Sequence, residues 1–343
     1  MATRVVTFGE IMLRLSPPGF ERLFQSPVLS ATFGGGEANV AVSLAHFGLD
    51  SCYVTRLPAH AIGDAALRAL RAEGVRTNHI VRGGNRVGIY YAEAGASQRA
   101  STVVYDRAHS AISEWPDDAV EWGDVMDGAA WYHVTGITPA LGDAAAAATK
   151  ESIQAAKRAG ARVSVDLNYR KKLWTQAQAQ AVMRPLMSSV DVVIANEEDL
   201  QSVLGVHMPD TDVTSATLNI QAYRDAAEWV TRKLGPPLVA ITLRESLSAS
   251  DNGWSAVLWD GASGTLHQSQ RYDVRLVDRI GGGDSFAAGL IYGLTNERGH
   301  EGALRFAVAA SALKQTIPGD FNRVSVAEVD ALAKGDASGR VQR

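Results

Sequence analysis

Residues 277–290 read VDRIGGGDSFAAGL, in which three consecutive glycines and an aspartate precede a run of small apolar residues. Consecutive glycines let the backbone reach positive φ angles and bring its N–H groups close to a ligand. The apolar run predicts a buried helix whose first turn begins near Asp284, and the free N–H groups at such a helix end attract anions, phosphate above all. We therefore expect the amides of Gly281, Gly282 and Gly283 to form an anion hole. Asp284 would act beside them as a general base for a hydroxyl that attacks the phosphate.

The same four residues have a simpler interpretation as a flexible turn in which Asp284 is an ordinary N-cap. They do not match the G-x-x-x-x-G-K-[ST] phosphate loop, because no Lys-Ser or Lys-Thr follows the glycines. The positive end of the helix dipole is expected to lower the pKa of Asp284 and to make it a weak base. A weak base is compatible with a loose transition state, in which the proton leaves late.

Composition restricts the class of protein. The chain has 343 residues, of which 46% are hydrophobic and 20% charged, enough for one large α/β domain or two smaller ones. A net charge of −4 argues against nucleic acid or an anionic membrane as a partner. We see neither 18 consecutive apolar residues nor a signal-peptide pattern, and we expect a cytoplasmic protein. A single cysteine, Cys52, excludes an internal disulfide and a multi-cysteine metal site.

Strand-like and helix-like segments alternate along most of the chain. Apolar runs predict strands at 5–10, 51–57, 131–137, 162–168, 191–195 and 237–243, and an antiparallel edge pair at 253–261 and 264–270. Helical spacing falls at 38–47, 63–73, 143–159, 175–189, 197–204, 220–234, 284–297, 300–315 and 325–333. This alternation predicts an α/β protein with a mainly parallel central sheet and helices on both faces.

Two segments interrupt the alternation. Residues 12–33 are irregular and proline-containing, and residues 84–110 contain two strand-like runs joined by a polar turn, which predicts a hairpin. We expect residues 12–33 and 84–110 to form a β lid, residues 1–11, 34–83 and 111–335 the core, and residues 336–343 a flexible tail. The open edges of lid strands favour a homo-oligomer.

A second glycine-rich stretch, GGGEANVA at residues 34–41, opens the first helix. Together with DRIGGGDSF at 278–286, it resembles the paired signature motifs of the ribokinase (phosphofructokinase B) family of sugar kinases. NEED at 196–199 resembles that family's N-x-x-E motif near the nucleotide phosphates and magnesium. The resemblance extends from about residue 4 to 333. It implies a three-layer α/β sandwich with a β lid, and a reaction that uses ATP and Mg²⁺. A monovalent cation is a further candidate cofactor.

Within that family, four stretches resemble the kinases of 2-keto-3-deoxygluconate: YDR at 105–107, GITPAL at 136–141, DLNYRKKLW at 166–174 and IPGDFN at 317–322. The resemblance implies ATP-dependent phosphorylation of the 6-hydroxyl, which gives 2-keto-3-deoxy-6-phosphogluconate. Residues that would contact the sugar acid are Gly35, Asn39, Tyr90, Tyr105, Arg107, Ile137, Arg170 and Asp284. Residues that would contact the nucleotide are Asn196, Thr242, Gly281, Gly283 and Asn322. Asp199 would bind magnesium through a water molecule.

Two arginines carry the argument for an acidic sugar, because a carboxylate matches the guanidinium fork and a neutral sugar needs no such partner. Arg170 lies in a basic run and has an alternative interpretation as a solvated cation, so Arg107, on the hairpin beside Tyr105, is the better discriminator. Glu197 and Glu198 are further magnesium candidates, or simply acids at a helix start.

The chain departs from the family's pattern at three places. Asp199 replaces a glutamate, Arg279 replaces a small residue or proline, and TLRES at 242–246 lacks the usual Lys-x-Gly. The alternatives are therefore a fructokinase-like or other sugar kinase of the same family, and a catalytically silent sugar or nucleotide sensor. A dinucleotide-binding dehydrogenase is excluded, because neither glycine-rich stretch reads G-x-G-x-x-G after a strand.

Overall fold

A ten-stranded sheet forms the centre of the computed structural model, which describes residues 2–206 and 220–336. The strand order is β13-β12-β11-β10-β9-β8-β1-β4-β5, and β14 pairs with β12. All pairs from β5 to β11 are parallel, whereas β12, β13 and β14 are antiparallel to their neighbours. The bounds are β1 Arg4–Phe8, β4 Asp50–Leu57, β5 Ile80–Arg82, β8 Trp131–Thr135, β9 Arg162–Asp166, β10 Val192–Ala195, β11 Leu238–Ser246, β12 Asp251–Asp260, β13 Thr265–Gln268 and β14 Tyr272–Arg275.

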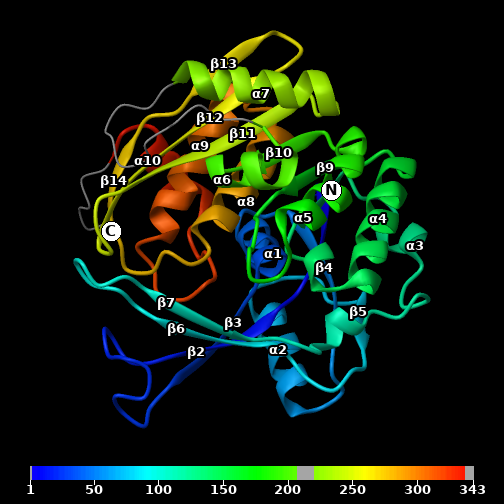
Figure 1. The fold of residues 1–343 in the computed structure, drawn as a ribbon, viewed down its shortest axis with the longest axis vertical. Helices are drawn as coiled ribbons and strands as arrows, with labels where there is room; N and C mark the ends of the chain where they lie inside the picture. The colour runs from blue at the N-terminus through cyan, green and yellow to red at the C-terminus, as the bar shows by residue number, and fades with distance from the viewer. Residues whose placement is uncertain (1, 207–219, 337–343) are drawn as a thin grey trace.

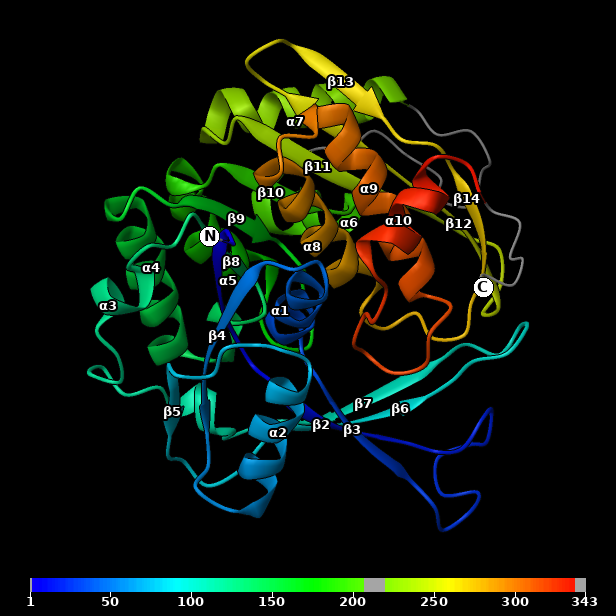
Figure 2. The same ribbon diagram turned by 180° about the vertical axis from the view of Figure 1, so that it is seen from behind.

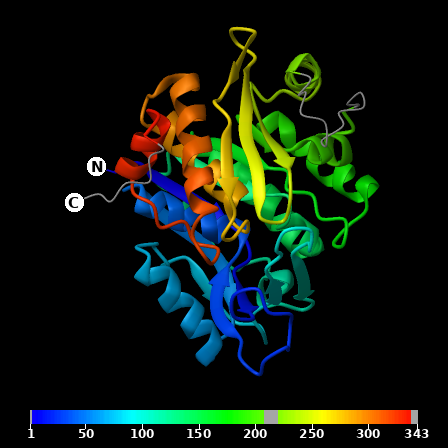
Figure 3. The same ribbon diagram turned by 90° about the vertical axis from the view of Figure 1, so that its left-hand side faces the viewer.

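Helices cover both faces of this sheet, because successive residues of each buried strand point to opposite faces (Figure 3). In β1, Val6 and Phe8 belong to one core cluster and Val5 to another. The first face is covered by α3 Trp122–Met126, α4 Asp143–Arg158, α5 Gln176–Leu186 and α7 Ile220–Leu234 (Figure 1). The second is covered by α1 Gly36–His46, α8 Gly282–Thr295, α9 Gly299–Lys314 and α10 Val326–Ala333 (Figure 2). A third cluster packs α2 Ala61–Ala72 against α1 and β4.

A separate four-stranded sheet lies below the central one in Figure 1. Its order is β3-β2-β6-β7, with β2 and β6 parallel and the outer pairs antiparallel. The bounds are β2 Met12–Ser16, β3 Ser30–Gly34, β6 Ile89–Glu93 and β7 Thr102–Asp106. The predicted α/β architecture, with a mainly parallel central sheet and a small second sheet, is thus confirmed.

Several details differ from the sequence-based expectation. The three-residue β5 and the five-residue α3 were not predicted, because such short segments carry no periodic pattern. α8 begins at Gly282, two residues before the expected start, because Gly281 takes the left-handed conformation at φ 84° and forms the N-cap. The expected tail lies outside the described residues from 337 onward. Among the described residues, no helix is long and apolar enough to span a bilayer.

Candidate active site

A cleft of about 800 Å³ opens at the carboxyl ends of the central strands, where ligands bind in open α/β sheets. Its wall includes Asp166 at the end of β9, Ala195 at the end of β10 and the loop that leads into α8. The second sheet contributes Tyr90 and Tyr105 from β6 and β7. The cleft is therefore walled by both sheets.

Nearly every residue predicted for the site lines this cleft. These residues are Gly35, Asn39, Tyr90, Tyr105, Arg107, Ile137, Arg170, Asn196, Asp199, Thr242, Gly281, Gly282, Gly283 and Asp284. The structure does not bring Asn322 to the cleft wall: it is buried, and its side-chain amide donates to the Ser285 hydroxyl at 2.7 Å.

The glycine run is positioned by close backbone contact. A Cβ atom on Gly281 would lie 2.3 Å from the main-chain oxygen of Asp320, and its positive φ also disfavours any other residue. α8 then starts at Gly282, and the first N–H groups of a helix have no partner within the helix. The Gly282 N–H donates to the main-chain oxygen of Arg279 at 3.3 Å. The glycine run borders the cleft, so its amides can donate hydrogen bonds to the oxygens of a bound phosphate.

Asp284 lies in the first turn of α8 and does not cap the helix, which rules out the simpler interpretation as an N-cap. Its carboxylate accepts a hydrogen bond at 2.7 Å from the side-chain amide of Asn39 in α1. The Asn39 amide oxygen accepts in turn from the N–H of Gly35 at 3.2 Å, which fixes the orientation of the Asn39 side chain. The two glycine-rich motifs thus meet at one carboxylate.

The expected lowering of the Asp284 pKa is wrong. Burial raises the pKa of Asp284 to about 6, although the Asn39 hydrogen bond and the charges of Arg170 and Lys314 act in the opposite direction. Loss of hydration outweighs the favourable helix end, because Asp284 as a whole residue is only 9% exposed. The shift makes Asp284 a stronger base near neutral pH than an ordinary aspartate.

A second carboxylate group lies across the cleft. Asp199 and Asn196 form two hydrogen bonds, in which the main-chain N–H of each residue donates to the side-chain oxygen of the other. Asp199 also accepts from the Tyr169 N–H at 2.9 Å. Burial raises the pKa of Asp199 to about 6. The pKa of Asp166 is raised well above its usual value by burial and by the negative charges of Asp199 and Asp284. Sequence reasoning missed Asp166, although an aspartate at the carboxyl end of a buried parallel strand is a recognisable signal.

The two arginines differ in their surroundings. Arg107 is buried, forms an ion pair with Glu10 and lies over the ring of Tyr105 at 5.4 Å. Among the described residues, neither Nε of Arg107 nor Oε1 of Glu10 has a hydrogen-bond partner, although both atoms are buried. Arg170 is exposed and donates to the main-chain oxygen of Tyr169 at 3.1 Å.

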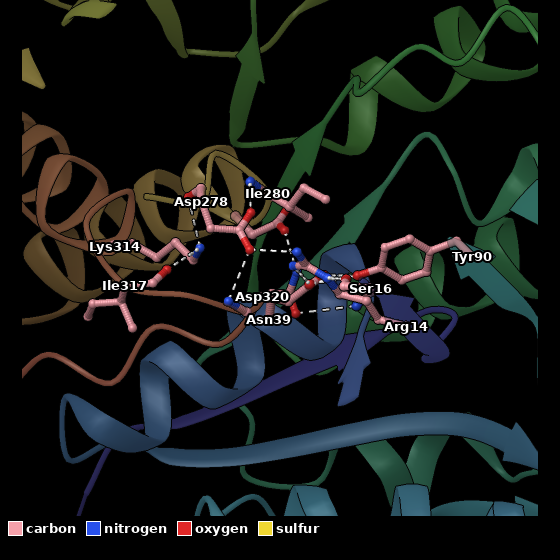
Figure 4. A network of polar contacts seen from close by, with 12 residues as sticks. Arg14, Ser16, Asn39, Tyr90, Asp278, Ile280, Lys314, Ile317 and Asp320 are labelled. Carbon is pink, nitrogen blue, oxygen red and sulfur yellow. Dashed lines mark hydrogen bonds and ion pairs between the residues drawn. The ribbon is translucent and has the colours of Figure 1, made fainter. Parts of the chain in front are cut away.

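A buried charge network ties the second sheet to the loop before α8 (Figure 4). Arg14 of β2 contacts Asp278 at 2.6 Å and Asp320 at 2.7 Å. The hydroxyl of Tyr90 in β6 donates to Asp320 at 2.6 Å. Asp278 and Asp320 stand inside motifs that the sequence singled out, but nothing in the sequence marks Arg14 as their partner.

One group of potential metal ligands lies elsewhere in the described part of the chain. Ligand atoms of Asp260, His267 and His300 all lie within 4.8 Å of one another. The Asp260 carboxylate already accepts from the Ser263 hydroxyl at 2.6 Å and from the Ala262 N–H at 3.0 Å, so it stabilises the turn between β12 and β13. We assign this group a structural role.

Comparison with known proteins agrees with the geometry of the cleft. Residues 2–323 match the model of the pfkB family of carbohydrate kinases. The chain is 32% identical to 2-dehydro-3-deoxygalactonokinase of Haloferax volcanii over 99% of both chains. It is 27% identical to 2-dehydro-3-deoxygluconokinase of Bacillus subtilis over 96% of this chain and 94% of that protein. The crystal structure of 2-dehydro-3-deoxygluconokinase from Thermotoga maritima is 51% identical, with a TM-score of 0.93 over 97% of this chain and 100% of that one. The chain therefore belongs to the pfkB family of carbohydrate kinases, phosphotransferases that act on an alcohol group.

Proposed function

We propose that the protein transfers the γ-phosphate of ATP to the 6-hydroxyl of 2-keto-3-deoxygluconate and releases 2-keto-3-deoxy-6-phosphogluconate. The observation that carries this proposal is the buried Asp284 carboxylate, held by Asn39 beside the amides that start α8. The name of the 51% identical Thermotoga maritima kinase supports the choice of sugar.

In the proposed reaction, the oxygen of the sugar hydroxyl forms a bond to the γ-phosphorus, and Asp284 accepts the proton that this hydroxyl loses. Oδ2 of Asp284 is engaged by Asn39, which leaves Oδ1 for the substrate proton. The Gly281–Gly283 amides stabilise the negative charge on the transferred group. ATP supplies the phosphoryl group, and ADP leaves as the bond to its β-phosphate oxygen breaks.

The nucleotide and magnesium assignments are also proposals. We assign the nucleotide to Asn196, Thr242 and the Gly281–Gly283 loop, which line the cleft, and retain Asn322 as a prediction only. Both oxygens of Asp199 accept main-chain N–H groups, so a contact to Mg²⁺ through water fits better than direct coordination. The raised pKa values of Asp199 and Asp166 fit a site that a divalent cation would stabilise.

We assign recognition of the sugar's carboxylate to Arg107. Arg107 lines the cleft, and its buried Nε lacks a partner among the described residues, so we propose that a substrate oxygen accepts a hydrogen bond from it. The Haloferax volcanii relative, named for the galactonate epimer, favours a second candidate substrate, 2-keto-3-deoxygalactonate.

Three further points stay predictions. They are the division into core and lid with the boundaries given above, a cytoplasmic location, and a homo-oligomer that pairs through the lid edges. β3 and β7 are the outer strands of the second sheet and offer such edges. A monovalent cation also stays a prediction. The residues beside the anion hole are relevant to it, and they are described in the next subsection.

The test is ADP release with 2-keto-3-deoxygluconate, its galactonate epimer, fructose, ribose and no sugar, for the wild type and Arg107→Ala. We expect turnover with a keto-deoxy acid, and a loss of kcat/KM in Arg107→Ala equivalent to about 2–5 kcal/mol. Arg86→Ala is the matched control, because Arg86 pairs with Asp106 at the exposed end of the same hairpin and should leave kcat/KM unchanged. Turnover with fructose that Arg107→Ala retains would contradict the acidic substrate, and ATP binding without any turnover would favour a sensor.

A further inference from the structure

Lys314, the last residue of α9, is fully buried behind the anion hole. Its ammonium donates to the main-chain oxygens of Asp278 at 3.2 Å and Ile317 at 3.4 Å, as Figure 4 shows. A Cβ atom on Gly281 would lie 3.1 Å from Cε of Lys314, so the lysine passes directly behind the first glycine of the run. A buried ammonium is costly unless its surroundings compensate for lost hydration.

The ammonium lies where two loops meet. Asp278 lies in the loop between β14 and α8, and Ile317 belongs to the loop that follows α9. The main-chain oxygen of Gln315 accepts from the N–H of Asp278 at 3.1 Å, and the N–H of Gly319 donates to the Asp278 carboxylate at 3.0 Å. Lys314 therefore joins the two loops at the base of the anion hole.

The surroundings of this ammonium resemble those of a bound cation. Main-chain carbonyl oxygens are the groups that replace the hydration shell of monovalent ions in proteins. Burial lowers the pKa of Lys314, whereas the charges of Asp278 and Asp320 oppose that shift and favour the charged form. The charge of Lys314 also favours the carboxylate form of Asp284.

We propose that the Lys314 ammonium is a built-in cation, a positioning residue that holds the Gly281–Gly283 amides in shape and places a positive charge behind them. An ion from solution is then not needed at this place, because the lysine's own nitrogen lies between the two carbonyl oxygens. The inference rests on the proposed kinase reaction and deepens it.

A purely structural lysine would show a different pattern. It would lower stability when removed, but added ions would not restore catalysis, and the affinities for ADP and ATP would change together. A charge behind the anion hole acts mainly on the γ-phosphate, so its loss should weaken binding of a non-hydrolysable ATP analogue more than binding of ADP.

The first measurement is the kcat of the wild type in potassium, sodium and tetramethylammonium salts of equal ionic strength. We expect the three values to agree within about 2-fold, because tetramethylammonium is too large to enter a carbonyl site. A requirement of the wild type for potassium would overturn the inference. This result decides the question even if a Lys314 variant fails to fold.

The second measurement compares Lys314→Ala, Lys314→Met and the control Lys157→Met, whose lysine pairs with Asp191 at the surface. We expect kcat to fall about 10²-fold in both Lys314 variants and to stay unchanged in the control. Potassium or methylammonium should restore part of the kcat of Lys314→Ala, where space is opened, but not of Lys314→Met, where the side chain fills it.

Retention of kcat in folded Lys314→Ala, or a loss that no small cation relieves, would overturn the proposal. Calorimetry with ADP and the ATP analogue needs no sugar, so it separates the two proposals. Absence of turnover with every sugar would contradict the proposed function alone, whereas equal weakening of both nucleotides would contradict the role of Lys314.

Discussion

Asp284 and Asn39 are the pair of residues on which the proposed chemistry depends. Asn39 donates to one carboxylate oxygen, and the Gly35 N–H fixes the orientation of its amide. Burial raises the pKa of Asp284 although the residue lies at a helix start. The burial of this carboxylate, rather than the helix dipole, therefore sets its basicity.

This pKa predicts the pH dependence of the wild type. Asp284 must be ionised to accept a proton, so kcat/KM should be full above the folded-state pKa and fall as the pH drops through about 6. In Asn39→Ala the midpoint should move to higher pH, because the hydrogen bond that favours the carboxylate is lost. The measurement is a pH profile of kcat/KM.

Ser43→Ala is the matched control for that profile. The Ser43 hydroxyl donates to the main-chain oxygen of Asn39 one turn along the same buried helix, and it does not touch Asp284 in the described contacts. An unchanged midpoint in Asn39→Ala, or an equal shift in Ser43→Ala, would contradict the assignment of the acid limb to Asp284.

At the scale of elements, β2 and β6 are tied to the loop before α8 by charged and polar side chains. Arg14 contacts Asp278 and Asp320, and Tyr90 also donates to Asp320. These links tie the second sheet to the loop before α8, so we expect a shift of that sheet to change the shape of the proposed phosphate site.

Removal of Arg14 should be strongly destabilising. Arg14→Met would leave the buried Asp320 and the partly buried Asp278 without this charge partner, and we expect a loss of about 3–5 kcal/mol in the free energy of unfolding. Arg22→Met is the control, because Arg22 pairs with Glu93 in the same sheet but is 66% exposed, and its loss should cost about 0–1 kcal/mol. Urea denaturation measures both, and equal losses would contradict the proposed coupling.

Elements with strong patterns could be predicted from the sequence, and the contacts between them could not. The parallel strands are continuous apolar runs, and the small apolar residues after the glycines predicted α8 to within two residues of its start. Short elements such as β5 lack a pattern, and the pairing of Arg14 with Asp278 and Asp320 depends on residues 264 and 306 positions apart.

At the scale of the whole molecule, the cleft brings together two glycine-rich motifs that lie far apart in the sequence. α1 and α8 pack on the same face of the sheet and bring Asn39 to Asp284 across 245 residues of sequence. Most residues predicted from the motifs line the cleft, whereas the solvation of each charge required the fold. That is why the pKa of Asp284 was predicted in the wrong direction and Asp166 and Lys314 were missed.

The most direct test of the account is the kcat of Asp284→Asn with 2-keto-3-deoxygluconate and ATP, measured together with ATP affinity. The substitution keeps the shape of the side chain and removes the base. We predict that kcat falls by about 10²- to 10⁴-fold while ATP affinity stays close to that of the wild type. A kcat within a few-fold of the wild type would contradict the role of Asp284 and with it the proposed mechanism.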